Sequence, residues 1–282
     1  MPKRAAHHLL FLAQSRPDIA DRWGYHIRPI HYYEPIPDFR SITAEQITQR
    51  RTYPGIDFRR DDQLTLLNQL SSYRDELRAI EFNFENEYFS GLDAAVYYAL
   101  IRHLKPQRII EIGGGYSTQL ANKALSANGK GKLTCVEPYP EDRLARANLN
   151  IKIIEKPVEQ LDVDFFSCLE ANDILFIDSS HTVKFGSDVC FEFLEVLPRL
   201  KPGVWIHVHD IFFPHDYPSD WLIDQRLALN EQYLLEAFLS FNEAFSPQLA
   251  NYWLSLDHPA EAARLWPTSN DKPASFWMKR VK

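Results

Sequence analysis

Cysteine and methionine are scarce in this sequence of 282 residues, and positive charge is in deficit. There are three cysteines, two methionines and 31 basic residues against 38 acidic ones, so the formal net charge is −7. An odd number of cysteines, none spaced as Cys-x-x-Cys, argues against a disulfide framework and a zinc knuckle. We expect Cys135, Cys168 and Cys190 to be reduced and mostly buried. The acidic balance argues against a dedicated nucleic-acid binder.

Long apolar segments are also missing. No apolar run approaches the roughly 20 residues that a helix needs to cross a bilayer. The apolar stretch 9–13 follows two histidines and is too short for the core of a signal peptide. We therefore expect no membrane partner and a cytoplasmic location.

Aromatic residues, by contrast, are abundant at 13% of the chain. Several of them lie between the prolines of residues 17–60, and prolines at this density prevent long helices and suggest an ordered arm. Thr43 and Gln46 have the spacing of a capping box, which predicts a short helix to about Arg51. Apolar spacing over 61–80 predicts an amphipathic helix.

From residue 90 onward, strand patterns alternate with helical ones. A helix is expected over about 90–104, before Pro106. Strands are then expected at 108–112, 132–136, 151–154, 173–178 and 203–209. Strands that alternate with helices predict a parallel sheet with helices on both faces.

The last part of the chain has a different pattern. We expect a long helix over about 220–241 and strands at 248–254 and 275–281, paired as an antiparallel hairpin. The expected fold class is therefore α/β, with a Rossmann-like, doubly wound, mainly parallel sheet of seven strands. We expect this domain to span 89–282 and residues 1–88 to form an N-terminal arm and helical cap.

Residues 108–118 predict a strand, a glycine turn and the start of a helix. Glycines let the backbone turn sharply and let a ligand approach, and the helix start offers free N–H groups. Such a turn at the carboxyl end of the first strand favours a nucleotide-like ligand. The pyrophosphate-binding pattern GxGxxG needs a third glycine where this chain has Thr118. The Glu111 carboxylate would also repel a pyrophosphate, whereas it can pair with a cationic amino group.

The ordered set of Glu111, Gly113 and Gly115 resembles the ExGxG motif of class I S-adenosylmethionine (SAM)-dependent methyltransferases. In that family an acid at the end of the second strand binds both ribose hydroxyls, and Glu137 fits this position. The resemblance implies SAM as the cofactor. The cofactor-binding residues that it implies are Glu111, Gly113, Gly114, Gly115, Tyr116, Ser117, Thr118, Glu137, Pro138, Val158 and Asp178.

Two later strand ends carry titratable side chains. One strand ends in FIDSSH, residues 176–181, and the next in HVHD, residues 207–210. Because both carboxyl ends point to the crevice of the glycine turn, we expect Asp178, His181, His209 and Asp210 to converge there as catalytic residues. His207 shares a side of its strand with His209, and we expect it to be a hydrogen-bonded core residue.

These strand ends, with LKPG at 200–203 and HYYEPIPD at 31–38, resemble bacterial methyltransferases grouped with macrocin O-methyltransferase and the cephamycin methyltransferase component. In that group aspartates at these positions bind Mg²⁺, which implies Asp178 and Asp210 as metal ligands. Ile211 stands where a second Asp or an Asn is frequent in that group, and its side chain cannot bind metal. Two routes to a reactive hydroxyl therefore stay open: Mg²⁺ on the two aspartates, or His181 or His209 as general base.

The resemblance implies a methyltransferase that acts on a small-molecule hydroxyl, such as one on a sugar or natural-product scaffold. Residues 1–88 are then the candidate region for acceptor recognition, with His31, Tyr32 and Tyr33 as candidate substrate contacts. Two alternatives are a NAD-dependent oxidoreductase on a related sheet and a non-catalytic binding module that keeps the SAM fold. The sequence leaves homo-oligomerisation open.

Overall fold

The computed structural model describes residues 10–11, 14–140, 144, 151–267 and 272–282. The chain divides into two compact units. One comprises Met1–Gln46 with Ser219–Ala228, and the other comprises Ile47–Pro218 with Leu229–Lys282. The smaller unit contains the short helix α2 (Pro17–Arg22) and the single π-helical turn η6 (Asp220–Asp224). Helix α3 (Ala44–Thr48) crosses the division between the units.

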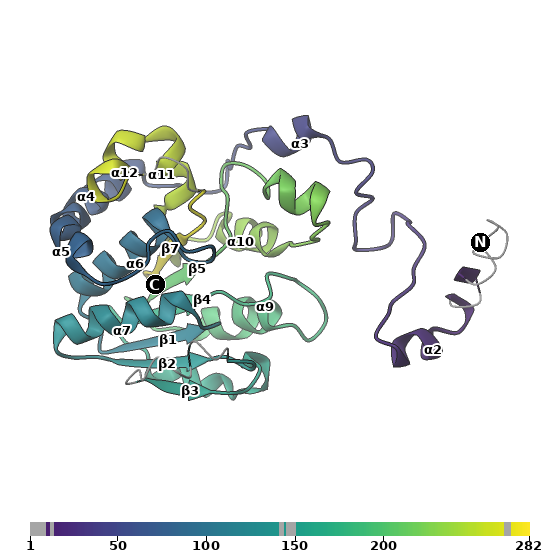
Figure 1. The fold of residues 1–282 in the computed structure, drawn as a ribbon, viewed down its shortest axis with the longest axis horizontal. Helices are drawn as coiled ribbons and strands as arrows, with labels where there is room; N and C mark the ends of the chain where they lie inside the picture. The colour runs from purple at the N-terminus through teal and green to yellow at the C-terminus, as the bar shows by residue number, and fades with distance from the viewer. Residues whose placement is uncertain (1–9, 12–13, 141–143, 145–150, 268–271) are drawn as a thin grey trace. The chain divides into compact units, whose positions relative to one another are not determined.

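The larger unit is built on a seven-stranded sheet with the order β3-β2-β1-β4-β5-β7-β6 (Figure 1). Its parallel strands are β1 (Arg108–Ile112), β2 (Lys132–Val136), β3 (Lys152–Ile154), β4 (Ile174–Ile177) and β5 (Trp205–Val208). Strand β7 (Phe276–Arg280) pairs antiparallel with β5, and β6 (Phe245–Ala250) pairs antiparallel with β7. The predicted α/β class and doubly wound, mainly parallel sheet are confirmed. The strand order reverses between β1 and β4, which is where such sheets bind ligands.

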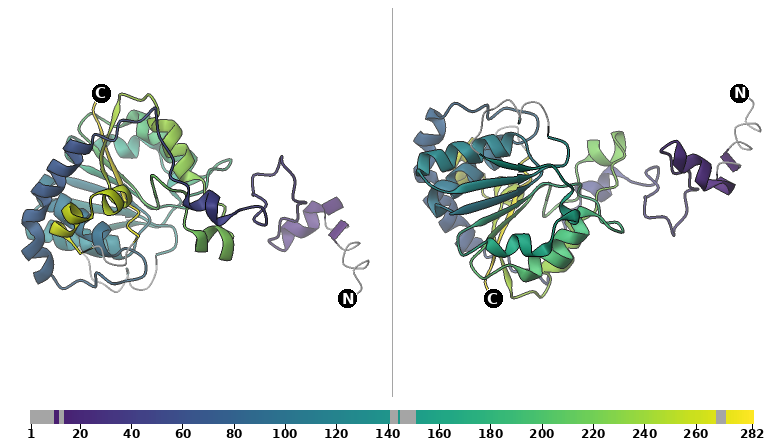
Figure 2. Two further views of the ribbon diagram at one scale, coloured as in Figure 1. Left: turned by 90° about the horizontal axis from the view of Figure 1, so that it is seen from above. Right: turned by 90° about the horizontal axis from the view of Figure 1, so that it is seen from below.

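Helices cover both faces of this sheet (Figure 2). The α-helices of this unit are α4 (Arg60–Leu70), α5 (Arg74–Ala79), α6 (Gly91–Leu104), α7 (Tyr116–Asn128), α9 (Asp188–Phe191), α10 (Glu231–Leu239), α11 (Asn251–Asp257) and α12 (Pro259–Leu265). Its 3₁₀ and π turns are η1 (Ser71–Tyr73), η2 (Val158–Gln160), η3 (Val163–Cys168), η4 (Glu192–Val196) and η5 (Leu197–Arg199). Alternate residues of β1 point to opposite faces: Ile109 packs in the apolar cluster of α6 and α7, and Ile110 in the cluster of α10.

The C-terminal part corrects three expectations. The long helix predicted over 220–241 is absent, because η6 ends at Asp224 and α10 begins only at Glu231. The strand predicted at 248–254 ends at Ala250, and Asn251 begins α11. Helices α11 and α12 lie between β6 and β7, so these strands pair without forming a hairpin.

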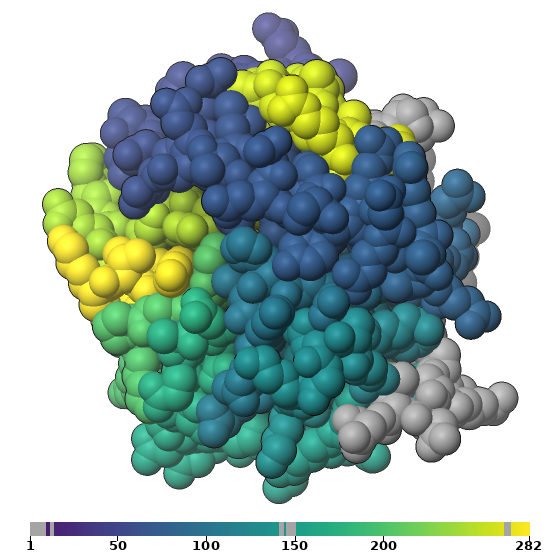
Figure 3. Space-filling model, turned by 90° about the vertical axis from the view of Figure 1, so that its left-hand side faces the viewer, coloured from purple at the N-terminus to yellow at the C-terminus, as the bar shows by residue number. Residues whose placement is uncertain are grey.

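Helices α4 and α5, which the sequence assigned to the N-terminal cap, belong to the larger unit. The helix predicted over 61–80 is interrupted at η1, where Ser71 Oγ donates to the Leu67 carbonyl. Leu67, Leu70 and Leu77 are buried in the same cluster as α6, and α12 lies against α4 (Figure 3). The compact units therefore divide the chain near residue 46, whereas the sequence placed the boundary after 88.

Smaller expectations have mixed outcomes. Thr43 and Gln46 form the predicted capping box, although the helix ends at Thr48 rather than near Arg51. Of the three free cysteines, only Cys135 is buried, while Cys190 is partly buried and Cys168 is exposed. The expectation that they would be mostly buried is therefore wrong. Among the described helices, none has the length and apolar character needed to cross a membrane.

Candidate active site

The glycine turn joins β1 to α7 at the carboxyl edge of the sheet. Gly113 has a φ of +82°, and a Cβ there would lie 1.9 Å from the backbone oxygen of Asp178. Only glycine therefore permits the ends of β1 and β4 to approach so closely. The N–H of Gly114 donates to Glu137 Oε2 at 3.1 Å, while a Cβ on Gly115 would meet no described atom within 4 Å. The turn thus contacts Glu137 on one side and faces open space on the other.

Glu111 lies buried directly beneath this turn. Its Oε1 accepts hydrogen bonds from the hydroxyls of Ser117 and Thr118, whereas its buried Oε2 has no hydrogen-bond partner among the described residues. Burial raises the pKa of Glu111 to about 8, although the two hydroxyls favour its ionised form. The unpaired oxygen can accept from a cationic donor brought in by a ligand.

A cavity of about 380 Å³ opens at the ends of β1, β2 and β4. Four carboxylates line it, from Glu137, Glu159, Asp178 and Asp188, and none of the described lining residues carries a positive charge. Such a cavity favours a cationic ligand. Its lining is Ile112, Gly113, Val136, Glu137, Pro138, Tyr139, Pro157, Val158, Glu159, Asp178, Ser179, Ser180 and Asp188.

Five of the predicted cofactor contacts line this cavity: Gly113, Glu137, Pro138, Val158 and Asp178. The others lie outside its lining, in β1, the turn and the start of α7: Glu111, Gly114, Gly115, Tyr116, Ser117 and Thr118. The structure thus divides the predicted set between the cavity wall and the turn beside it.

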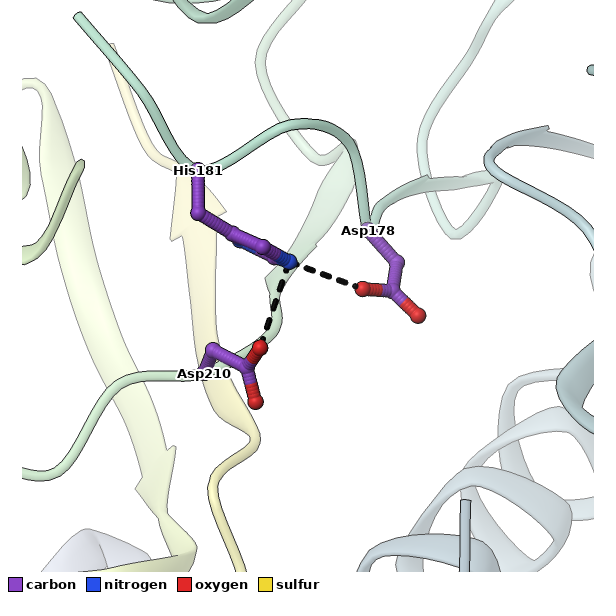
Figure 4. A group of neighbouring side chains, drawn as sticks. All are labelled: Asp178, His181 and Asp210. Carbon is purple, nitrogen blue, oxygen red and sulfur yellow. Dashed lines mark ion pairs between the residues drawn. The ribbon is translucent and has the colours of Figure 1, made fainter. Parts of the chain in front are cut away.

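The ends of β4 and β5 bring Asp178, His181 and Asp210 together (Figure 4). His181 Nε2 lies 3.3 Å from Asp178 Oδ1 and 3.2 Å from Asp210 Oδ2. One ligand atom from each residue lies within 4.8 Å of the others. Both His181 and Asp210 have a positive φ, of 55° and 57°. Few non-glycine residues adopt this backbone conformation, and such strain gathers at functional sites.

A fourth group, which the sequence did not reveal, is Glu231 at the start of α10. Its Oε2 lies 2.7 Å from His181 Nδ1, and the residue is completely buried. Glu231 is 50 residues from His181 in the chain, so no motif spacing links the two. Its position follows only from the packing of α10 against the loop after β4.

The four groups shift one another's pKa values. Burial alone would lower the pKa of His181, but its hydrogen bonds to Asp178 and Glu231 hold that pKa well above the ordinary histidine value. Burial likewise opposes ionisation of Asp178, yet the histidines at positions 209 and 181 lower its pKa to about 2. The resting site therefore favours an imidazolium held between carboxylates.

His207 in β5 and His209 directly after this strand differ in role. His207 Nε2 lies 2.8 Å from Ser275 Oγ, and burial lowers the His207 pKa well below its ordinary value, so it is the expected neutral core residue. His209 is also buried, with Nε2 3.8 Å from Asp210 Oδ1. Burial lowers the pKa of His209, but Asp178 and Asp210 more than offset this and raise it. His209 is thus a neighbour of the cluster, and His181 is its centre.

The remaining candidates are not members of this cluster. His31, Tyr32 and Tyr33 belong to the smaller unit, where the rings of Tyr32 and Tyr33 lie 4.2 Å apart and are 80% and 79% exposed. Their role as substrate contacts stays a prediction. Ile211 is buried, and its N–H donates to the Ala274 carbonyl.

Part of this chain is similar to known protein families and proteins. Residues 110–211 match the family model of a methyltransferase domain. An uncharacterized protein of Archaeoglobus fulgidus is 37% identical over 167 residues, which are 52% of this chain and 75% of that protein.

Two solved structures are also similar. The O-methyltransferase TomG of Streptomyces achromogenes, in complex with SAM, has a TM-score of 0.43 and 15% identity over 78% of this chain and 90% of that one. An O-methyltransferase of Bacillus cereus, in complex with SAH, has a TM-score of 0.40 and 17% identity over 77% and 91% of the two chains. Residues 110–211 are similar to a methyltransferase domain, and by sequence this chain belongs to the same family as the archaeal protein.

Proposed function

We propose that this protein is a SAM-dependent O-methyltransferase that acts on a hydroxyl group of a small molecule. The observation that supports this best is the cavity with four carboxylates beside a buried Asp–His–Asp cluster, with Asp178 belonging to both. SAM is cationic at its sulfonium and its amino group, so its charge suits this lining. When bound, SAM supplies a methyl group activated by the sulfonium.

Glu137 has the hydrogen-bonding capacity to hold a ribose. Its Oε2 accepts from the Gly114 N–H, and its Oε1 accepts from the Tyr139 N–H. A carboxylate offers about four acceptor sites, so one site on each oxygen is left for two ribose hydroxyls. Val158, buried at the cavity wall, would pack near the adenine, and Glu111 Oε2 would pair with the amino group.

His181 Nε2 is the atom that we assign to receive the proton of the acceptor hydroxyl, when the ring carries its only proton on Nδ1. The O–H bond breaks as the N–H bond forms, and the carboxylates of Asp178 and Asp210 stabilise the resulting imidazolium. A divalent cation is the other route. Mg²⁺ would be held by oxygens of Asp178 and Asp210 and would lower the pKa of the hydroxyl. Binding of Mg²⁺ at this place would require His181 Nε2 to be deprotonated.

The carboxylate lining disfavours a NAD-dependent oxidoreductase, because four acids would repel a pyrophosphate. Three points stay predictions. They are the finer resemblance to the macrocin and cephamycin group, a sugar or natural product as the acceptor, and recognition of that acceptor by residues 1–88. The transfer experiment described next distinguishes an enzyme from a non-catalytic module.

The test is transfer of a labelled methyl group from SAM to catechol, a flavonoid and a hexose glycoside. We expect transfer to at least one acceptor and a fall in turnover of about 10²–10⁴-fold in His181→Asn. His103→Asn, at an exposed site in the last turn of α6, is the control and should not change turnover. If EDTA leaves turnover unchanged, the base route holds, and if EDTA abolishes turnover, the metal route holds. A chain that binds SAM but transfers nothing would instead fit the non-catalytic module.

A further inference from the structure

Among the described residues of the candidate active site, Glu231 makes hydrogen bonds only to His181. It does not line the cavity, its Oε2 lies 2.7 Å from His181 Nδ1, and its Oε1 is buried without a hydrogen-bond partner among the described residues. We propose that Glu231 is the positioning residue of His181, which holds the ring by Nδ1 and so directs Nε2 to Asp178 and Asp210. The pairing of Glu231 with His181 is inferred from geometry alone. The expected effect of Glu231 on turnover rests on the proposed function.

The start of α10 holds the backbone of His181 as well as its ring. The N–H groups of Asn230 and Glu231 donate to the His181 carbonyl at 3.1 and 3.2 Å. The Asn230 side chain also accepts from the Val183 N–H and donates to the Val183 carbonyl. These contacts fix the loop where His181 has its strained, positive φ. Helix α10 thus fixes the loop and the imidazole at the same point.

The two ring nitrogens of His181 face different partners, and this fixes the orientation of the ring. Nδ1 lies 2.7 Å from Glu231 Oε2, whereas Nε2 lies 3.3 Å from Asp178 Oδ1 and 3.2 Å from Asp210 Oδ2. Because Glu231 holds Nδ1, a rotation of the imidazole that moved Nε2 out of the crevice would break this contact. Without Glu231, the described side-chain contacts that still orient the ring are those with Asp178 and Asp210 alone.

Three variants of the full-length chain test this proposal. Glu231→Ala removes the acceptor, and Glu231→Gln keeps the shape and an amide oxygen that can still accept. Glu236→Gln changes the same residue type on the same helix, where Glu236 pairs with Arg51 at 2.7 Å instead of with the site. Glu231→Gln keeps the test decisive if Glu231→Ala fails to fold.

The first readout is the ¹H–¹⁵N spectrum of the histidine side chains. We expect a slowly exchanging Nδ1–H resonance from His181, identified by its loss in His181→Asn. It should disappear in Glu231→Ala, shift in Glu231→Gln and stay unchanged in Glu236→Gln. The second readout is turnover with the acceptor found in the transfer experiment. We expect kcat to fall about 10–100-fold in Glu231→Ala with SAM affinity unchanged, and to recover partly in Glu231→Gln.

The outcomes separate this inference from the proposed function. A His181 Nδ1–H resonance that persists in folded Glu231→Ala would overturn the pairing. Loss of the resonance with no change in turnover would overturn the positioning role. If the wild-type chain transfers no methyl group, the proposed function fails, and the spectrum alone still decides whether Glu231 holds His181.

Discussion

Glu111 shows at the scale of one residue how a binding motif can reduce stability. Its carboxyl group is fully buried under the glycine turn, where burial raises its pKa to about 8 despite two hydroxyl donors. An apolar or amide side chain of similar size would avoid this cost. We therefore interpret the Glu111 carboxylate as a partner for a cationic ligand rather than as a structural group.

We expect Glu111→Gln to flatten the pH dependence of stability. The pKa of Glu111 is about 8 in the folded chain and near its ordinary value of 4.5 when unfolded, so between these pH values the folded state holds a proton that the unfolded state has lost. The contribution of Glu111 is thus fully present below pH 4.5 and is lost as pH rises through 8, by up to about 5 kcal/mol. Urea unfolding at pH 5, 7 and 9 measures this change in the free energy of unfolding. Glu155→Gln, at an exposed position, is the control. If the free energy of unfolding depended on pH in the same way in Glu111→Gln and in the wild type, the account would be contradicted.

At the same scale, the sequence predicted the members of the Asp178–His181–Asp210 cluster but not Glu231. The aspartates and His181 follow directly after predicted parallel strands, whose carboxyl ends must meet at one edge of the sheet. Glu231 begins a helix that the sequence pattern merged with residues 220–230. Because only tertiary packing brings it to His181, no local signal could have identified it.

Asp93 joins three elements by hydrogen bonds that local patterns do not contain. From α6, its Oδ1 accepts from Asn251 Nδ2 at 2.8 Å and from the Ser275 N–H at 3.1 Å, and its Oδ2 accepts from the Ala274 N–H at 2.6 Å. It thereby fixes the start of α11 and the approach to β7. Ser275 Oγ in turn contacts His207 and lies 3.4 Å from His209 Nδ1.

We expect Asp93→Ala to lower the free energy of unfolding by about 3 kcal/mol, because it leaves the buried donors of Asn251, Ala274 and Ser275 without acceptors. Urea unfolding at neutral pH measures this loss. Asp164→Ala, at an exposed position in η3, is the matched control and should change stability by less than about 0.5 kcal/mol. A loss below about 1 kcal/mol for Asp93→Ala would show that Asp93 does not hold these elements together.

The same contact explains why one strand prediction was wrong. The residues of 248–254 are mostly apolar, and an apolar run of that length suits a strand or a buried helix equally. The side chain of Asn251 binds Asp93, 158 residues away, and α11 begins at Asn251. The parallel strands were predictable because each is a short apolar run between helical patterns, whereas the end of β6 depends on this distant partner.

At the scale of the whole molecule, the candidate site lies within the larger of the two compact units. The residues of the cavity, the Asp178–His181–Asp210 cluster and Glu231 all belong to it, as does the methyltransferase domain match over 110–211. The sequence predicted the sheet, but the apolar faces of α4 and α5 do not reveal that these helices pack against α6. The expected domain boundary after residue 88 stays a prediction. Acceptor recognition by the aromatic residues of the smaller unit stays a prediction.

Titration calorimetry with SAM on the full-length chain tests the central claim most directly. We expect binding in the micromolar range and at least about tenfold weaker binding by Glu137→Ala, because that variant loses charge-assisted hydrogen bonds to the ribose. Glu155→Ala, exposed and outside the cavity lining, should bind like the wild type. Absence of SAM binding by the wild-type chain, equal affinity in Glu137→Ala, or binding of NADH in its place would contradict the account.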